Sequence, residues 1–209
     1  VSLRAGETLT FKREFERFAA QNGVKVLKYH ADNGIFNAAE FRAHIDLKDQ
    51  ELEFSGVGAH HQNGVAERAI QSITSWARAM LLHSAIHWPL QANLDLWPFA
   101  LEQAVYLWNN LPNADTSLSP IEIFTSQKVS NYEHLLRMHV WGCTVYVLEP
   151  TLQDGKKIPK WMPRSRRGQF VGLSPEHSTT IGRIRNIRTG HISPQFHVVY
   201  DDYFTSVPN

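Results

Sequence analysis

Apolar side chains in the first half of the chain recur at the spacing of one helix face. Phe11, Phe15, Phe18 and Ala19 predict a core-facing helix over residues 7–22, and Asn22-Gly23 supplies its end. Similar spacing predicts helices over residues 37–47 and 64–84. A further helix begins near Pro98, and its apolar face consists of Trp97, Leu101, Ala104, Val105 and Trp108. Residues 24–29 and 52–57 predict short strands between these helices.

After residue 139, apolar residues recur at every second position instead of at the spacing of a helix face. Alternation predicts strands over residues 144–148, 168–172, 183–187 and 196–200, separated by turns such as Asp154-Gly155 and Thr189-Gly190. Closely spaced short strands are typical of a small barrel. We therefore expect an α/β part over residues 1–112, a linker over 113–138 and an all-β domain over 139–204.

Composition narrows the classes of protein only slightly. The 209 residues carry a net charge of +1, so any preference for nucleic acid must come from local clusters of charge. The single cysteine, Cys143, excludes an intrachain disulfide and a cysteine-rich zinc ribbon within this chain. No apolar run approaches the roughly 20 residues that span a bilayer, so no membrane partner is expected. The chain begins with Val1 and its first methionine is Met80, from which we expect either a fragment of a longer product or a product whose start has been lost.

Two carboxylates follow predicted elements in a way that suggests a shared site. Asp32 follows the strand over residues 24–29, and Glu67 lies one turn into a helix that Asn63 can cap. Within about 4 Å of each other they would repel by roughly 4 kcal/mol at an effective dielectric of 20, unless a hard cation such as Mg²⁺ bound both. The alternative is that both are solvated surface acids, as most acidic residues are.

The surrounding motifs resemble the integrase core of copia-type LTR retrotransposons. The resemblance begins with Asp32-Asn33-Gly34 and Phe36, and continues with His61-Gln62-Asn63-Gly64-Val65-Ala66-Glu67-Arg68. Further matches are Trp108-Asn109-Asn110-Leu111-Pro112, Ser119-Pro120-Ile121-Glu122, Trp141-Gly142-Cys143-Thr144-Val145-Tyr146 and Phe170-Val171-Gly172. The resemblance implies an α/β ribonuclease H-like integrase core, N-terminally truncated with its first strands missing, followed by a small SH3-like barrel.

The resemblance also implies roles for individual residues. Asp32 and Glu67 would be the second and third members of an acidic triad that binds two Mg²⁺ or Mn²⁺ ions. Asn33, Gly34, His61, Gln62, Asn63 and Gly64 would shape the turn and the helix start that present them. The family's first Asp lies on an earlier strand, whereas the acids before Asp32 are Glu7, Glu14 and Glu16, all in the first predicted helix. We therefore expect the first catalytic Asp to be absent from this chain and the chain alone to be inactive.

His60 and His61 raise the alternative of a zinc pair or a general base. Adjacent histidines in an extended loop point apart, and no second His/Cys pair has the spacing of zinc ligands. Positioning of the active-site loop is the interpretation we favour for His61.

Basic side chains gather in the predicted β domain, where Asp154 and Glu176 are the only acids between residues 151 and 190. The candidate nucleic-acid-binding residues are Arg68, Lys156, Lys157, Lys160, Arg164, Arg166, Arg167, Arg183 and Arg185. The alternative is a solvated basic face. Six tryptophans suggest base stacking, but the core spacing of Trp97 and Trp108 favours packing.

These expectations combine into one functional hypothesis and two alternatives. The resemblance implies a polynucleotidyl transferase that integrates DNA by metal-dependent 3′-processing and strand transfer, with element ends and target DNA as partners. It also implies a homo-multimer, located in the nucleus or in cytoplasmic virus-like particles. One alternative is a non-enzymatic retrotransposon remnant that binds DNA or protein. The other, a ribonuclease H-type nuclease, is disfavoured by residues 62–68 and by the appended barrel.

Overall fold

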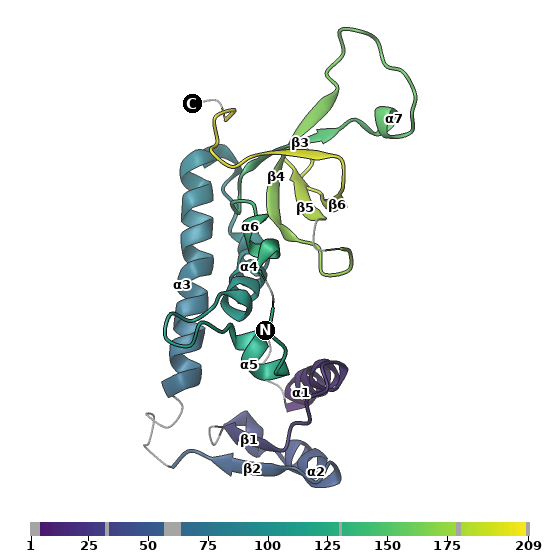
Figure 1. Cartoon of the computed structure of the whole chain (residues 1–209). Coiled ribbons are helices and arrows are strands. Elements are labelled where there is room, and N and C mark those ends of the chain that lie inside the picture. The colour runs from purple at the N-terminus through teal and green to yellow at the C-terminus, as the bar shows by residue number, and fades with distance from the viewer. Residues whose placement is uncertain (1–4, 32–33, 57–63, 130, 179–180, 208–209) are drawn as a thin grey trace. The chain divides into compact units, whose positions relative to one another are not determined.

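The structure is a computed structural model of residues 1–209 and describes residues 5–31, 34–56, 64–129, 131–178 and 181–207 (Figure 1). The chain forms two compact units. The first comprises Val1–Gln71 with Ile121–Lys128, and the second comprises Ser72–Pro120 with Val129–Asn209. The three-part division expected from the sequence stays a prediction.

The first unit contains a small parallel sheet with helices. Its elements are α1 (Ala5–Gln21), β1 (Lys28–Ala31), η1 (Ile35–Asn37), α2 (Ala39–Leu47), β2 (Glu51–Phe54), the start of α3 (Gly64–His87) and most of α5 (Pro120–Thr125). β1 and β2 pair in parallel, with Lys28 opposite Glu51 and Ala31 opposite Phe54. The predicted helices are confirmed, whereas β1 begins at Lys28, four residues later than the predicted strand.

The buried face of α1 differs from the predicted one. Lys12 and Ala19 are buried, whereas Phe11 is 64% exposed, so core packing was wrongly predicted for this phenylalanine. Phe15 and Phe18 also remain partly exposed, although both rings contact Phe124 of α5, with centroids 5.9 and 6.1 Å away. The polar face of α1 can be buried because hydrogen bonds from other elements satisfy it.

The second unit is built on an antiparallel sheet. Its strands are β3 (Thr144–Leu148), β4 (Ser165–Leu173), β5 (Gly182–Asn186), β6 (Ile192–Gln195) and β7 (Val198–Asp201), in the order β6-β5-β4-β3-β7. The fold class is therefore α/β, with an open five-stranded sheet among the described residues. The bounds of β3 were predicted in full, β6 was not predicted as a separate strand, and closure into a barrel stays a prediction.

Short helices complete the second unit. They are η3 (Pro89–Gln91), η4 (Leu94–Leu96), α4 (Trp97–Asn110), α6 (Glu133–Leu136) and α7 (Pro150–Gln153). None of the described helices combines the length and apolar character that a bilayer crossing requires.

Two apolar clusters hold the second unit together. One forms around the sheet and contains Trp88, Cys143, Val145, Val147, Phe170, Ile184 and Phe204. The other joins α3 and α4 to the sheet and contains Ala77, Leu96, Ala100, Ala104, Trp141 and Val171.

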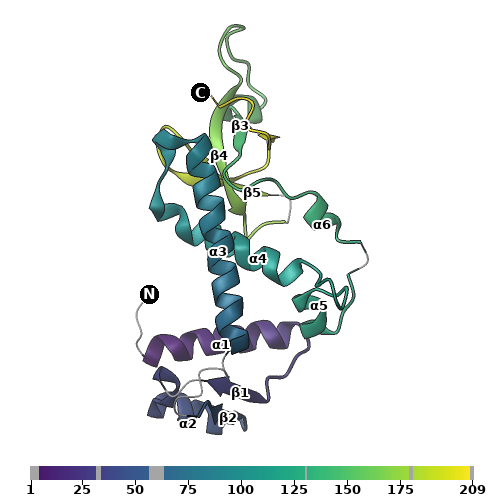
Figure 2. The same ribbon diagram turned by 90° about the vertical axis from the view of Figure 1, so that its left-hand side faces the viewer.

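α4 lies against β4 (Figure 2). Its buried positions are Ala100, Gln103 and Ala104, whereas Trp97 is 48% exposed and Val105 is also exposed. The predicted apolar face of this helix is therefore wrong for Trp97 and Val105. Alanines allow the closest approach of the helix backbone to the strand, which moves the large side chains to the rim of the contact.

Candidate functional site

The structure describes the end of the strand that leads to Asp32. β1 ends at Ala31, which is buried and whose carbonyl accepts a hydrogen bond from Ser55 N at 2.9 Å. Asp32 and Asn33 follow directly and lie outside the described residues. Gly34 is the next described residue; it is exposed and directly precedes η1. The prediction that Asp32 follows a strand end is thus confirmed, while the position of its carboxylate stays a prediction.

Glu67 lies in the first turn of α3, which begins at Gly64 as predicted. Its side chain is exposed and lies at the positive end of the helix dipole. A Cβ placed on Gly64 would lie 3.3 Å from a guanidinium nitrogen of Arg68, so this basic side chain sits beside the helix start. His61, Gln62 and Asn63, which were predicted to shape the site, lie outside the described residues.

The described residues contain no cluster of three or more His, Cys, Asp or Glu side chains suited to a metal ion. Because Asp32 lies outside them, the pairing of Asp32 with Glu67 stays a prediction. The earlier acids Glu7, Glu14 and Glu16 all lie on α1, in agreement with the predicted helix.

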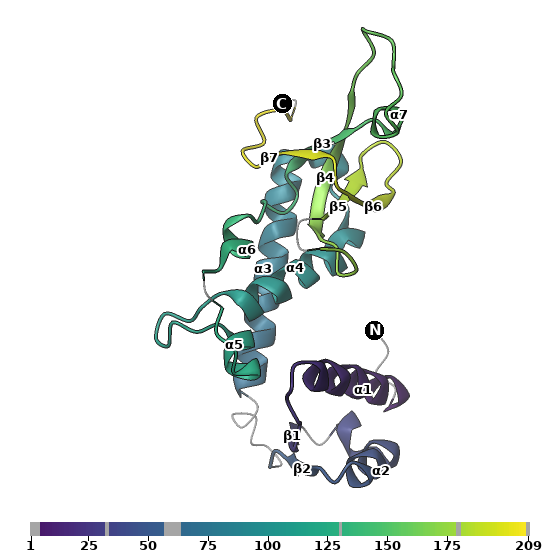
Figure 3. The same cartoon turned by 45° about the vertical axis from the view of Figure 1, so that its right-hand side comes forward.

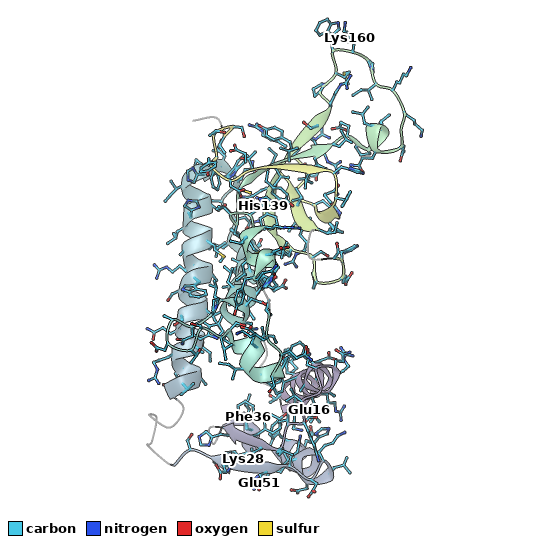
Figure 4. The ribbon with its side chains drawn as sticks, viewed as in Figure 1. Glu16, Lys28, Phe36, Glu51, His139 and Lys160 are labelled. Carbon is cyan, nitrogen blue, oxygen red and sulfur yellow. The ribbon has the colours of Figure 1, made fainter. Side chains whose placement is uncertain are left out.

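A buried polar cluster, which sequence reasoning missed, ties α1 to the elements beside β1. The ammonium of Lys12 donates to Glu16 Oε1 at 2.5 Å, to His44 Nδ1 at 3.0 Å and to Gln50 Oε1 at 2.7 Å. Glu16 Oε1 also accepts from Gln50 Nε2 at 2.7 Å and from the Tyr29 hydroxyl at 3.1 Å. We call these five residues the Lys12 cluster; Figure 4 labels Glu16 among them.

The protonation preferences within the Lys12 cluster agree with its hydrogen bonds. Burial lowers the pKa of His44 and the nearby Lys12 ammonium lowers it further, so neutral His44 accepts the bond from Lys12. Burial alone would raise the pKa of Glu16, but hydrogen bonds from Lys12 and Gln50 outweigh it and hold that pKa below its usual value. Burial and the Glu16 carboxylate raise the pKa of Tyr29 well above its usual value. Glu16 is therefore ionised within the cluster, which links α1 to β1 through the Tyr29 hydroxyl.

Three of the predicted DNA-binding arginines make contacts within the second unit. Arg183, whose side chain is 14% exposed, pairs with Glu102 at 2.7 Å. Arg185 donates to the carbonyl of Gln91 at 2.9 Å. Arg167 donates to the carbonyl of Ser206 at 3.3 Å. These guanidinium groups contribute to the fold of the second unit.

Most of the remaining predicted DNA-binding residues lie on one connection of the second unit. Residues 149–164 join β3 to β4 and project beyond the sheet (Figure 3); we call them the β3–β4 loop. Lys156, Lys157, Lys160 and Arg164 are exposed on this loop, and Arg166 follows on β4, partly buried. Lys156 lies 3.7 Å from Asp154, a solvent-exposed pair that contributes little. Among the described residues, the other four form no ion pair.

The chain is similar in sequence to polyproteins of plant transposons. The chain is 29% identical over 155 residues, 69% of its length, to the retrovirus-related Pol polyprotein from transposon TNT 1-94 of Nicotiana tabacum. It is 30% identical over 141 residues, 67% of its length, to the Pol polyprotein from transposon RE2 of Arabidopsis thaliana. Over 201 residues, 93% of its length, it is 28% identical to the Pol polyprotein from transposon RE1 of the same plant. These similarities support the interpretation that the chain is a region of a retrotransposon polyprotein.

The similar region is a small part of each relative. The chain covers 11%, 9% and 12% of the length of these three polyproteins, respectively. No protein-family model matches the chain.

Proposed function

We propose that this chain contributes to an integrase-type polynucleotidyl transferase, with Asp32 and Glu67 as ligands of Mg²⁺ or Mn²⁺. The observation that carries the proposal is the similarity to Pol polyproteins of plant transposons. The end of β1 just before Asp32 and the place of Glu67 in the first turn of α3 support it. A ribonuclease H-like core and an SH3-like barrel are parts of the same proposal, as are DNA partners, a homo-multimer and a nuclear or virus-like-particle location.

The donor set fits the proposed ions, because hard divalent cations prefer carboxylate oxygens and keep water or phosphate oxygens as their other ligands. When bound, such ions would activate a water or a DNA 3′-hydroxyl and stabilise the leaving oxygen of a phosphodiester. Asp32 and Glu67 would hold them, and Arg68 lies next to Glu67 for a phosphate contact.

We propose that α1 does not supply the third carboxylate of the triad. Glu16 accepts hydrogen bonds from Lys12, Gln50 and Tyr29 and is committed to the Lys12 cluster. Glu7 and Glu14 lie on the same helix rather than on a strand. We therefore propose that this chain alone does not catalyse strand transfer.

Calorimetric titration with Mn²⁺ tests the metal site. We expect the unchanged chain to bind the ion and both the Asp32→Asn and the Glu67→Gln variants to lose that binding, because each removes one ligand charge. Glu51→Gln is the matched control, since Glu51 is an exposed acid of the same unit and should leave binding intact. Absence of Mn²⁺ binding by the unchanged chain, with its fold verified by circular dichroism, would overturn the proposed site.

A second, non-enzymatic function is supported by the exposed cations of the β3–β4 loop. Lys156, Lys157, Lys160 and Arg164 lie on a segment that carries no acidic residue between positions 155 and 167. We propose that this loop binds the phosphate backbone of DNA without preference for sequence. Such binding releases counterions, so its affinity falls as salt rises.

Fluorescence anisotropy of a labelled DNA duplex over a series of KCl concentrations measures how the affinity of the chain for DNA depends on salt. Replacing the four cations by glutamine should weaken binding and flatten the plot of log affinity against log salt by about 0.9 for each phosphate that is no longer neutralised. The Lys25→Gln/Lys48→Gln double variant removes exposed positive charge from the first unit and should leave the slope unchanged. A salt-independent affinity, or an equal effect of the control, would contradict the proposed role of the loop.

A further inference from the structure

The far end of the β3–β4 loop is a tight turn that displays an aromatic side chain. The loop closes at its base through a hydrogen bond from Glu149 N to Arg164 O at 2.9 Å. At its far end, Met162 N donates to Pro159 O at 3.1 Å, which defines a turn with Lys160 and Trp161 at its two central positions. Figure 4 labels Lys160 at this end of the loop.

Trp161 is exposed to an extent that packing does not explain. Its side chain is 90% exposed, whereas Trp88 and Trp141 are buried in the two apolar clusters. Tryptophan is the side chain with most to gain from burial, so a fully displayed indole on a defined turn points to a partner. The sequence did not single out Trp161, because the general expectation for tryptophan is core packing.

The charge around Trp161 indicates the chemistry of that partner. The cations between residues 155 and 167 are Lys156, Lys157, Lys160, Arg164, Arg166 and Arg167, and no acid lies among them. The Lys160 ammonium is 5.5 Å from the centroid of the Trp161 ring. The partner should therefore carry negative charge close to a planar surface on which an indole can stack.

Nucleic acid with accessible bases has both properties. A regular duplex offers phosphates but keeps its base faces stacked, whereas an unpaired strand or a frayed end offers both together. We propose that Trp161 stacks on an unpaired base while the cations of the β3–β4 loop hold the adjacent phosphates. This inference rests on the proposed nucleic-acid-binding function and adds to it a residue and a class of substrate: single-stranded or frayed DNA.

An anionic membrane surface also combines negative charge with a place for an indole. At the turn, however, Trp161 and Met162 are the two large apolar side chains that are exposed, and Lys160 lies beside the indole. Membrane binding grows with the apolar area that is buried, and one indole with one thioether offers little such area, whereas stacking on a base needs only the face of the indole. The observations favour nucleic acid, and membrane binding becomes an outcome of the test.

The experiment uses the full chain and measures affinity for a labelled oligo-dT strand and for a duplex of equal length. The Trp161→Ala variant should bind the single strand about 5- to 100-fold more weakly, in line with the loss of one stacked base, and the duplex almost unchanged. The salt slope of Trp161→Ala should equal that of the unchanged chain, because an indole neutralises no phosphate. Lys160→Gln should instead flatten the single-strand slope by about 0.7.

Two further variants separate stacking from a general loss of apolar surface. Trp161→Phe keeps an aromatic face and should retain most of the affinity for the single strand. Tyr203→Ala removes an aromatic side chain that is 89% exposed and lies outside the loop, and it should bind like the unchanged chain. Circular dichroism should show the same fold for every variant, since both side chains are exposed.

The outcomes distinguish this inference from the function on which it rests. Failure of the unchanged chain to bind either DNA would overturn both proposals. Salt-dependent binding that Trp161→Ala leaves intact would overturn the stacking inference alone, and so would equal losses on the strand and the duplex. Vesicles of phosphatidylserine and phosphatidylcholine provide the last arm: loss of vesicle binding by Trp161→Ala with unchanged DNA binding would assign Trp161 to a membrane surface instead.

Discussion

Two adjacent aspartates near the C-terminus accept hydrogen bonds that join separate segments of the second unit. Asp201 accepts from Ser206 N at 2.8 Å, from Ser206 Oγ at 2.5 Å and from Thr205 Oγ1 at 3.0 Å. Asp202 accepts from Val140 N at 2.7 Å and pairs with His139 at 2.9 Å. Asp201 thus binds the segment that follows β7, and Asp202 binds the residues that precede β3.

The hydrogen bonds of Asp201 predict a dependence of stability on pH. Hydrogen bonds from Ser206, foremost that of its hydroxyl, lower the pKa of Asp201 from 3.8 to about 2. Because the folded state has the lower pKa, the stabilisation is complete above about pH 4 and is lost as pH falls toward 2. We expect Asp201→Asn to lower the free energy of unfolding at pH 7 by about 1 kcal/mol, a value reduced by solvent screening.

Urea unfolding at a series of pH values measures this difference. The difference in the free energy of unfolding between the unchanged chain and Asp201→Asn should become smaller as the pH falls. Asp154→Asn, at an exposed loop carboxylate, should unfold like the unchanged chain at neutral pH. A gap of constant size throughout the acid range would show that the hydrogen bonds of Asp201 do not depend on its ionisation.

At the scale of elements, the sequence predicted which segments are helices and strands better than which of their faces are buried. The bounds of β3, and those of α1, α2 and α3 to within about three residues, follow from local apolar spacing and from local end signals such as Asn22-Gly23. The buried face of α1 depends instead on His44 and Gln50, which lie 32 and 38 positions from Lys12. Local periodicity contains no information on partners at that separation.

The same limit applies to the candidate sites. The cations of the β3–β4 loop were predicted as a basic cluster because Asp154 and Glu176 are the only acids between residues 151 and 190. Arg183 and Arg185 belong to the same basic composition, yet Glu102 and Gln91 contact them from distant parts of the sequence. The strand end before Asp32 was predicted because its signals, an apolar run and a following Asn-Gly turn, are local.

At the scale of the whole molecule, the two units differ in what stabilises them. The first has a two-stranded parallel sheet and a buried polar cluster, and sheets of two strands are marginal on their own. The second has five paired strands and two apolar clusters that include the fully buried Val145 and Phe170. Local opening should therefore require less free energy in the first unit than in the second.

Hydrogen exchange of the intact chain, followed by mass spectrometry, tests this difference. Amides in peptides from β3 and β4 should exchange slowest, and those from β1 and β2 should exchange at least about ten times faster relative to their unfolded rates. Lys12→Met should accelerate exchange in β1 and β2 further, because it leaves the partly buried Glu16 carboxylate without its ammonium partner. Exchange in β3 and β4 should not change, since the Lys12 cluster lies within the first unit.

Lys25→Met is the matched control for this experiment, because it makes the same substitution at an exposed position of the first unit. It should leave exchange in both sheets as it is in the unchanged chain. Equal protection of β1 and β3 would contradict the ranking of the two units. An effect of Lys12→Met on both sheets would show that the units unfold as one, in which case the Lys12 cluster stabilises the whole chain rather than the strand that precedes Asp32.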